Sequence, residues 1–418
     1  MKIDRHDRII GERKSGIHRH RLEAKGTINA KLALYLVGVT CLISGFAQFF
    51  YNPILPFVQA ELQTTLTWVN LTVTVYTVSM ACMQVVFGSV ADRRGRRRAL
   101  LIGLTLFVIA SFGAAFAKSI YALLIARALQ GMGAASVPVV AAAVIGDLFE
   151  GKERTKAMGT YQVIMALAPA IGPLIGGIIG GNYGYFGVFL FLALTAVILL
   201  LANAVWLKES KPNITADAAR LSVKSFKVFL IRRKSRAIML IGLTQAFSST
   251  ILMVFIPTIF SQYFKATPGI IGASFLLMSL CFIISLKAGH KLEHLWGAEK
   301  SFVYGCWLNA VSVVLFAFVI WVSLPFGILL FCFYGATYGI SMPPPLTMLT
   351  ELFKEERATA VSIYNLCRNA GMALAPMIGA LLYSSQSTWL LFGTVFVVYG
   401  IGISLCRYLL HDNNQPLR

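Results

Sequence analysis

Two arginines, Arg127 and Arg368, lie inside long apolar stretches of the sequence, and they are the residues best suited to chemistry. A guanidinium can hold an anion or a carbonyl group through several hydrogen bonds, and it does so most strongly where water is excluded. No acidic residue lies inside such a stretch, because all 17 Asp and Glu residues fall in tails, between the stretches or at their ends. The sequence therefore predicts a polar interior that is neutral to positive.

The elements that must position these residues are long apolar runs. The chain has 418 residues, 57% of them hydrophobic and 13% charged, and its mean hydropathy is +0.73. A helix needs roughly 20 mostly apolar residues to cross a bilayer. Twelve runs of this kind cover residues 32–57, 67–90, 98–117, 120–143, 158–181, 185–207, 237–260, 269–288, 300–322, 324–347, 360–383 and 388–410. The composition argues against a soluble domain and predicts an all-α polytopic membrane protein.

The positions of the basic residues indicate how these spans are oriented. Of the 37 Lys and Arg residues, 33 fall in the two tails and in the loops after spans two, four, six, eight and ten. With twelve spans these segments share one face, and basic loops stay on the cytoplasmic side. The formal net charge of +20 therefore reflects membrane topology and does not indicate nucleic-acid binding. We expect a multi-pass protein of the cell membrane with both termini cytoplasmic.

The two halves of the sequence repeat one another at an offset near 203 residues. The segment from Asp147 reads DLFEGKERTKAMGTYQ, and the segment from Glu351 reads ELFKEERATAVSIYN. Six spans in each half give both halves the same orientation, so the predicted fold has twelve transmembrane helices in two parallel-related six-helix bundles. Its predicted parts are a basic cytoplasmic tail (1–31), an N-terminal bundle (32–207), a cytoplasmic linker (208–236), a C-terminal bundle (237–410) and a second cytoplasmic tail (411–418).

The loop after span two carries closely spaced glycines and charges. Its residues are Gly88, Asp92, Arg93, Gly95, Arg96 and Arg97. Glycines permit a tight turn, Asp92 can cap a helix start, and arginines can reach carboxylates at neighbouring helix ends. The pattern resembles the signature loop of the major facilitator superfamily, and the resemblance covers nearly the whole chain after the tail. It implies the major facilitator fold and a conformational latch between this loop and Asp147; the alternative is that the charges serve only to orient the loop.

Two further segments carry the resemblance. The stretch that starts Arg127-Ala-Leu-Gln130-Gly131 resembles the arginine motif of the fourth span in this superfamily. The fifth span resembles the motif of its antiporters, and its small and bend-forming residues are Pro169, Gly172, Pro173, Gly176 and Gly177. Glycines four residues apart let helices approach closely, and prolines bend a helix. The resemblance is to the twelve-span type that is similar to drug/proton antiporters.

Polar residues inside the spans are the candidates for binding a solute or a coupling ion, because such sites lie near the middle of the membrane between the halves. They are Arg127, Gln130, Gln48, Asn52, Gln84, Gln162, Gln245, Asn365, Arg368 and Asn369. Each could instead join one helix to another. Arg127 could also reach the outer surface, roughly 10 Å away at helical rise. Arg368 lies deeper, roughly 12 Å from the cytoplasmic end, and its repeat partner is the apolar Met165.

The resemblance implies secondary active transport of a small organic solute or drug by alternating access, as efflux by proton antiport. Because the spans hold no acidic residue, we expect the solute to be anionic, zwitterionic or neutral rather than a lipophilic cation. Uptake by symport, facilitated diffusion and a non-transporting sensor on the same fold remain alternatives. The expected partners are this small molecule, the proton and the lipid bilayer.

Two features of the sequence argue against a metal-dependent enzyme and against energy from a bound nucleotide. The segment His290-x-x-Glu293-His294 matches an inverted zinc-peptidase pattern. It falls in a predicted short loop that repeats the loop from Gly88, so we predict no metal site and no enzyme activity. The sequence also lacks the glycine-rich nucleotide-binding motif that ends in Lys and Ser or Thr. Energy is therefore expected from an ion or solute gradient, without a cofactor.

Overall fold

The computed structural model describes residues 30–210, 232–319, 322–342, 357–383 and 387–411, together with residues 345, 348, 349 and 352. Most of the first predicted tail, residues 211–231 of the predicted linker, Glu351 and residues 412–418 lie outside this part. The predicted domain boundaries at these places stay predictions.

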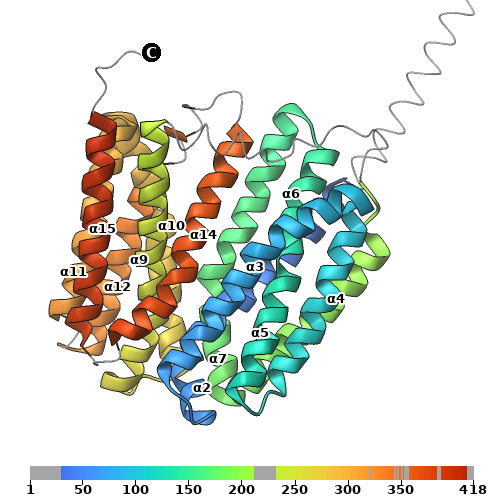
Figure 1. Cartoon of the computed structure of the whole chain (residues 1–418), viewed down its shortest axis with the longest axis horizontal. Coiled ribbons are helices and arrows are strands. Elements are labelled where there is room, and N and C mark those ends of the chain that lie inside the picture. The colour runs from blue at the N-terminus through green and yellow to red at the C-terminus, as the bar shows by residue number, and fades with distance from the viewer. Residues whose placement is uncertain are drawn as a thin grey trace, which may run out of the picture.

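All regular elements in the described part are helices (Figure 1). In lipid a single strand or loop would leave backbone groups without hydrogen-bond partners, whereas a helix satisfies them internally. The first span covers Ala30–Glu61 and ends in η1 (Asn52–Ile54) and α2 (Leu55–Glu61). The remaining helices are α3 (Leu66–Arg94), α4 (Arg96–Ala115), α5 (Ile120–Ala134), α6 (Ser136–Leu148), α7 (Gly151–Trp206), α9 (Arg233–Phe264), α10 (Pro268–Trp296), α11 (Ala298–Val319), α12 (Leu324–Ser341), α14 (Arg357–Tyr383) and α15 (Thr388–His411).

Ten segments of the described part are long and apolar enough to cross a membrane. One of them, Lys156–Trp206, contains both the fifth and the sixth predicted spans, and a kink at Gly184 of α7, where φ is 63°, separates the two. The eleventh predicted span corresponds to α14, which is not among the ten because Arg368 and its polar neighbours lower the hydropathy of the helix. The predicted all-α membrane fold is confirmed.

Several helices differ in extent from the predicted spans. The fourth span is divided into α5 and α6, next to Pro138, whose missing N–H cannot continue the helical hydrogen bonds. The segment with Glu293 and His294 was predicted as a loop, but α10 continues to Trp296 and makes it helical. The prediction of a loop was wrong because the polar residues there continue the helix beyond the apolar run.

The repeat is visible in how the helices pack. Figure 1 shows α9, α10, α11, α12, α14 and α15 as one group and α3 to α7 as the other. A Cβ on Gly131 of α5 would lie 2.3 Å from the Tyr76 carbonyl oxygen of α3. In the second half a Cβ on Gly335 of α12 would lie 2.4 Å from the Met278 carbonyl oxygen of α10. The same close approach therefore joins spans two and four and spans eight and ten.

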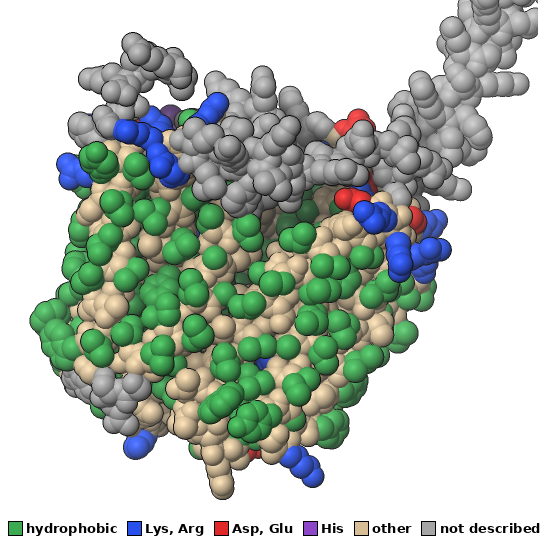
Figure 2. Space-filling model, viewed as in Figure 1, with side chains coloured by type: hydrophobic (Ala, Val, Ile, Leu, Met, Phe, Trp, Pro, Cys, Tyr) green, Lys and Arg blue, Asp and Glu red, His purple; other side chains and the backbone are tan. Residues whose placement is uncertain are grey.

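The two ends of the molecule differ in charge. Figure 2 shows Lys and Arg gathered at one end and apolar side chains over the band between the ends. We call this end, which carries exposed Arg98, Lys300 and Arg407, the basic end, and the end with Lys118 and Lys265 the outer end. Apolar side chains on the surface of this band, such as Val85 (69% exposed) and Ile284 (71% exposed), face outward, as contact with lipid requires.

The buried core is shared at the outer end and divided at the basic end. One cluster of buried apolar residues from mid-depth to the outer end contains Phe50 and Tyr76 of the first half together with Phe255 and Phe275 of the second. At the basic end, the described residues form two separate clusters, one confined to residues 30–207 and the other to residues 237–406. In this conformation the halves are therefore packed together at the outer end.

Candidate functional site

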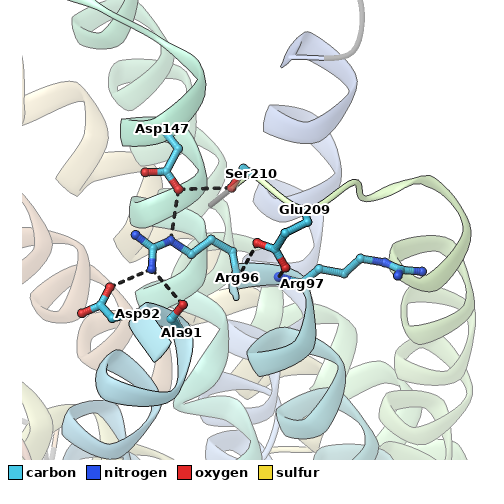
Figure 3. A network of polar contacts seen from close by, with 7 residues as sticks. All are labelled: Ala91, Asp92, Arg96, Arg97, Asp147, Glu209 and Ser210. Carbon is cyan, nitrogen blue, oxygen red and sulfur yellow. Dashed lines mark hydrogen bonds and ion pairs between the residues drawn. The ribbon is translucent and has the colours of Figure 1, made fainter. Parts of the chain in front are cut away.

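A network of charges at the basic end is built on the turn between α3 and α4 (Figure 3). Gly95 makes this turn with φ of 102°, a conformation that favours glycine. Arg96, which follows, donates from Nε to Asp147 Oδ2 at 3.0 Å and from Nη1 to Asp92 Oδ1 at 2.7 Å. Its Nη1 also donates to the Ala91 carbonyl at 2.8 Å. The predicted meeting of the loop with Asp147 is present in the structure.

Glu209 completes this network and was not a predicted site residue. Its two carboxylate oxygens accept from the backbone N–H groups of Arg96 at 2.8 Å and Arg97 at 3.3 Å, which are the first two of α4. A carboxylate at a helix N-terminus satisfies groups that have no partner within the helix. Glu209 thus takes the capping role expected of Asp92, whose carboxylate accepts from Arg96 instead. The sequence signal was an acidic residue directly after span six, opposite a basic loop.

The network ties the start of the linker to the loop. Ser210 donates from Oγ to Asp147 Oδ2 at 3.2 Å, and Arg97 donates from Nη2 to the Ala204 carbonyl. The side chains of Arg96 and Asp147 are each 13% exposed, so their ion pair is better shielded from water than a surface pair. All of these groups belong to the first half or to the start of the linker, and none belongs to the second half. Gly88 and Arg93 lie on the last turns of α3, and a latch role for the loop stays a prediction.

Arg127 lies inside the first bundle with none of its surface exposed. Its Nη1 donates to the Ala47 carbonyl at 3.0 Å and to Gln130 Oε1 at 2.6 Å. The Gln130 Nε2 donates in turn to Ser111 Oγ at 2.8 Å. The side chain therefore does not extend to the outer surface, and it joins the first span to α5 and, through Gln130, to α4.

Aromatic rings surround the Arg127 guanidinium. Its central carbon lies 4.2 Å from the ring centre of Tyr76, 5.1 Å from that of Tyr51 and 5.8 Å from that of Phe189. A cation held over ring faces is stabilised by about 2 kcal/mol or more when it is desolvated. Burial of an unpaired ion costs several kcal/mol, so these rings and carbonyls are what make the position tolerable. In this conformation Arg127 has no access to a solute.

Arg368 has a different environment, because it is half-buried on α14. Its guanidinium carbon lies 5.9 Å from the ring centre of Tyr364, and the guanidinium also interacts with the Tyr338 hydroxyl. Tyr338 stacks on Tyr334 at 5.8 Å and lies 5.5 Å from Phe282. A partly open cation beside a row of aromatic rings can hold a polar or anionic group and an aromatic ring at once.

The remaining candidates divide by exposure. Asn365, one turn before Arg368, and Gln162 are exposed, whereas Gln48, Gln84 and Asn369 are half-buried. Gln245 is buried and donates from Nε2 to Ser341 Oγ at 2.7 Å, so it joins α9 to α12. Asn52 is buried in η1. The structure thus brings Arg127 to Gln130, and Arg368 lies with Asn365 and Asn369 on α14, but it does not gather all ten candidates in one place.

The proline and glycine residues of α7 form the seam with α10. Pro173 has no N–H, so the Pro169 carbonyl four residues earlier lacks its helical partner. Ser279 of α10, which was not predicted as a site residue, donates to this carbonyl at 3.1 Å. A Cβ on Gly177 would lie 2.3 Å from the Pro268 carbonyl oxygen.

The neighbouring face of α7 contacts the first span. A Cβ on Gly176 would lie 2.3 Å from the Phe50 carbonyl oxygen, and one on Gly172 would lie 3.2 Å from Phe49. The small residues therefore hold α7 against its own half and against the other half at once. The α10 side of this seam could not be predicted from the sequence, because the serine and glycine residues that form it do not make a recognisable motif.

Comparisons with known proteins agree with this architecture. The sequence model of the Major Facilitator Superfamily matches residues 37–244 and 238–417. The chain is 25% identical over 394 residues to Multidrug resistance protein D of Escherichia coli (strain K12), covering 90% of this chain and 95% of that protein. It is also 35% identical over 154 residues to a Chloramphenicol resistance protein of Pseudomonas aeruginosa, covering 37% of each.

A solved structure shows the same fold. The inward-facing, unoccupied structure of a bacterial homolog to the human lysosomal transporter Spinster superposes with a TM-score of 0.77 at 15% identity, covering 93% of this chain and 99% of that one. The matches over both halves confirm the family predicted from the motifs. The chain belongs to the Major Facilitator Superfamily and is a multi-pass transporter of the membrane.

Proposed function

We propose that the protein exports a small organic solute from the cytoplasm by proton antiport through alternating access. The observation that supports this most is the uneven core: one apolar cluster joins the halves at the outer end, and the basic end has a separate cluster in each half. Alternating access requires two halves that separate at one end at a time. The names of the relatives, which are resistance proteins, support the outward direction.

The basic end is the cytoplasmic end in this proposal. The positive-inside rule supports that orientation, because Lys and Arg gather at this end. The conformation described here is then open toward the cytoplasm, where an exporter collects its solute. Both termini would lie on the same side.

The solute is held in this proposal at the half-buried Arg368 and the rings of Tyr338 and Tyr364. The cation favours an anionic, zwitterionic or neutral polar solute, and exposed Asn365 on the same helix offers a further donor and acceptor. A lipophilic cation would meet repulsion from Arg368. The relatives' names add aromatic and drug-like molecules such as chloramphenicol to the first solutes worth testing.

Flux measurements in proteoliposomes test the proposal. Purified protein is reconstituted in one orientation, a proton gradient is imposed in either direction, and the flux of chloramphenicol, an aromatic carboxylate and a quaternary ammonium ion is followed. Antiport predicts that solute accumulates on the side with more protons and that the gradient dissipates with it. Movement of solute together with protons would instead show symport, and flux independent of the gradient would show facilitated diffusion. Saturable binding without flux of any solute would overturn the proposal in favour of a sensor.

A further inference from the structure

A hollow on the surface of the second bundle lies between α11 and α15. Its volume is about 360 Å³, and Trp307, Ser404, Arg407 and Tyr408 line it. In Figure 1 both helices stand on the side of the second group that is farthest from α3 and α7. The hollow is therefore remote from the seam between the halves and from Arg368, and it opens on the surface that faces lipid.

Arg407 is a cation without a partner in the described part of the chain. It is exposed, and no hydrogen bond, ion pair or ring contact involves it there. Lys234 of α9, by contrast, bonds Glu299 Oε1 at 2.9 Å. Arg407 is thus available to bind an anion from outside the protein.

The depth of the lining residues matches the layers of a lipid. Arg407 lies four residues before the end of α15 at the basic end, roughly 6 Å along the helix. Trp307 lies nine residues after the start of α11, roughly 14 Å deep. Its ring packs against Phe396 at 6.5 Å and against the bare backbone of Gly400, which leaves the space open. The adjacent side chains of Val397 and Ile401 are 54% and 55% exposed.

We propose that this hollow is a binding site for an anionic phospholipid in the leaflet at the basic end. Arg407 and the Ser404 hydroxyl hold the phosphate, the exposed phenol of Tyr408 lies at headgroup depth, and the acyl chains follow Trp307, Val397 and Ile401. Basic pockets between transmembrane helices bind anionic headgroups in this way, and Trp and Tyr favour the membrane interface.

Native mass spectrometry of the full chain in detergent tests this site. The probes are phosphatidylglycerol and phosphatidylcholine with identical acyl chains, and the variants are Arg407→Gln and Arg98→Gln. Arg98 is a matched control, since it is exposed at the same end but lies on α4 of the first half. We expect Arg407→Gln to weaken binding of the first phosphatidylglycerol roughly tenfold, as loss of a charged hydrogen bond does. Arg98→Gln should leave the affinity for phosphatidylglycerol unchanged, and neither variant should change the affinity for phosphatidylcholine.

Further arms distinguish lipid from other anions. Inorganic phosphate and glycerol phosphate at millimolar concentration should not displace the lipid, because they lack the chains that fill the groove. Trp307→Leu should weaken the binding of both lipids without changing the ratio of the affinity for phosphatidylglycerol to that for phosphatidylcholine. Equal loss in Arg407→Gln and Arg98→Gln, equal affinity for the two lipids, or displacement by free phosphate would overturn the proposal. None of these measurements depends on transport, so their failure would leave the proposed export untouched.

Discussion

The two bundles share one backbone plan but differ at the matching position on spans four and ten. Gly131 and Gly335 make the same close approach to spans two and eight, which aligns Arg127 with Phe331 and Gln130 with Tyr334. In the first half this position holds a cation bonded to Ala47 and Gln130. In the second half Phe331 is fully buried and meets Phe275 edge-on at 5.0 Å.

The cation of the second half lies elsewhere. Arg368 on α14 is half-buried beside Tyr364, and its counterpart in the first half is Met165 on α7. One half therefore has a sealed cation that joins helices, and the other has an accessible cation. The difference teaches that the duplicated scaffold fixes where helices approach one another, while the chemistry of each half is set by side chains at positions that do not correspond.

Placing a cation at the matching position of the second half should have the largest effect. Phe331→Arg would bury a charge among the rings of Phe275 and Phe316, and Tyr334 stands where the first half has Gln130, so we expect a cost of several kcal/mol. We expect little folded protein in size-exclusion chromatography. Phe331→Leu is the control and should lose about 1–2 kcal/mol or less. A well-folded Phe331→Arg protein would show that the two sites are more alike than their contacts indicate.

Removing the sealed cation should be the next largest effect. Arg127→Met leaves the buried Gln130 Oε1 without a donor, which costs about 1–3 kcal/mol. Thermal unfolding in detergent should show a lower midpoint. The double variant Arg127→Met with Gln130→Leu removes both partners and should recover part of the loss. If the single variant is as stable as the parent, Arg127 does not join these helices.

Changing the accessible cation should alter transport more than stability. Arg368→Gln removes a charged hydrogen-bond donor worth about 1.5–3 kcal/mol, so apparent affinity for an anionic or neutral polar solute should fall roughly 10- to 100-fold. The unfolding midpoint should change little, because the side chain is half-buried. Met165→Leu is the matched control and should transport normally. Preferred transport of quaternary ammonium ions that persists in Arg368→Ala would contradict the assignment.

The turns before spans three and nine should show the smallest difference. Gly95 and Gly297 have φ of 102° and 81°, so alanine at either costs about 1 kcal/mol of backbone strain. A Cβ on Gly95 would also lie 2.3 Å from Glu209 Oε2, whereas one on Gly297 meets no described atom within 4 Å. Gly95→Ala should therefore lower the unfolding midpoint more than Gly297→Ala. In a Glu209→Ala background this excess should disappear; an excess that persists would mean that Glu209 does not contact the turn.

The fold could be predicted from the sequence because lipid imposes simple rules on it. Length and hydropathy gave the spans, and the basic loops gave their alternation. Helix ends were predicted less well, as in α10, since a helix that leaves the membrane can continue through polar residues. The site was predicted in part: the resemblance to the family's signature loop led us to expect a contact between its arginines and Asp147, but it did not indicate that Arg96 makes it, nor the roles of Glu209 and Ser279.

The sequence by itself determined the class of protein, the duplication, and which residues inside the spans are too polar to face lipid. The tertiary structure decided what those residues do, because burial and hydrogen bonding depend on neighbours that are distant in the chain. Arg127 and Arg368 are alike in sequence as single cations in apolar spans. Rings from three other helical segments, those of Tyr51, Tyr76 and Phe189, seal the first, whereas the second is only half-buried on α14.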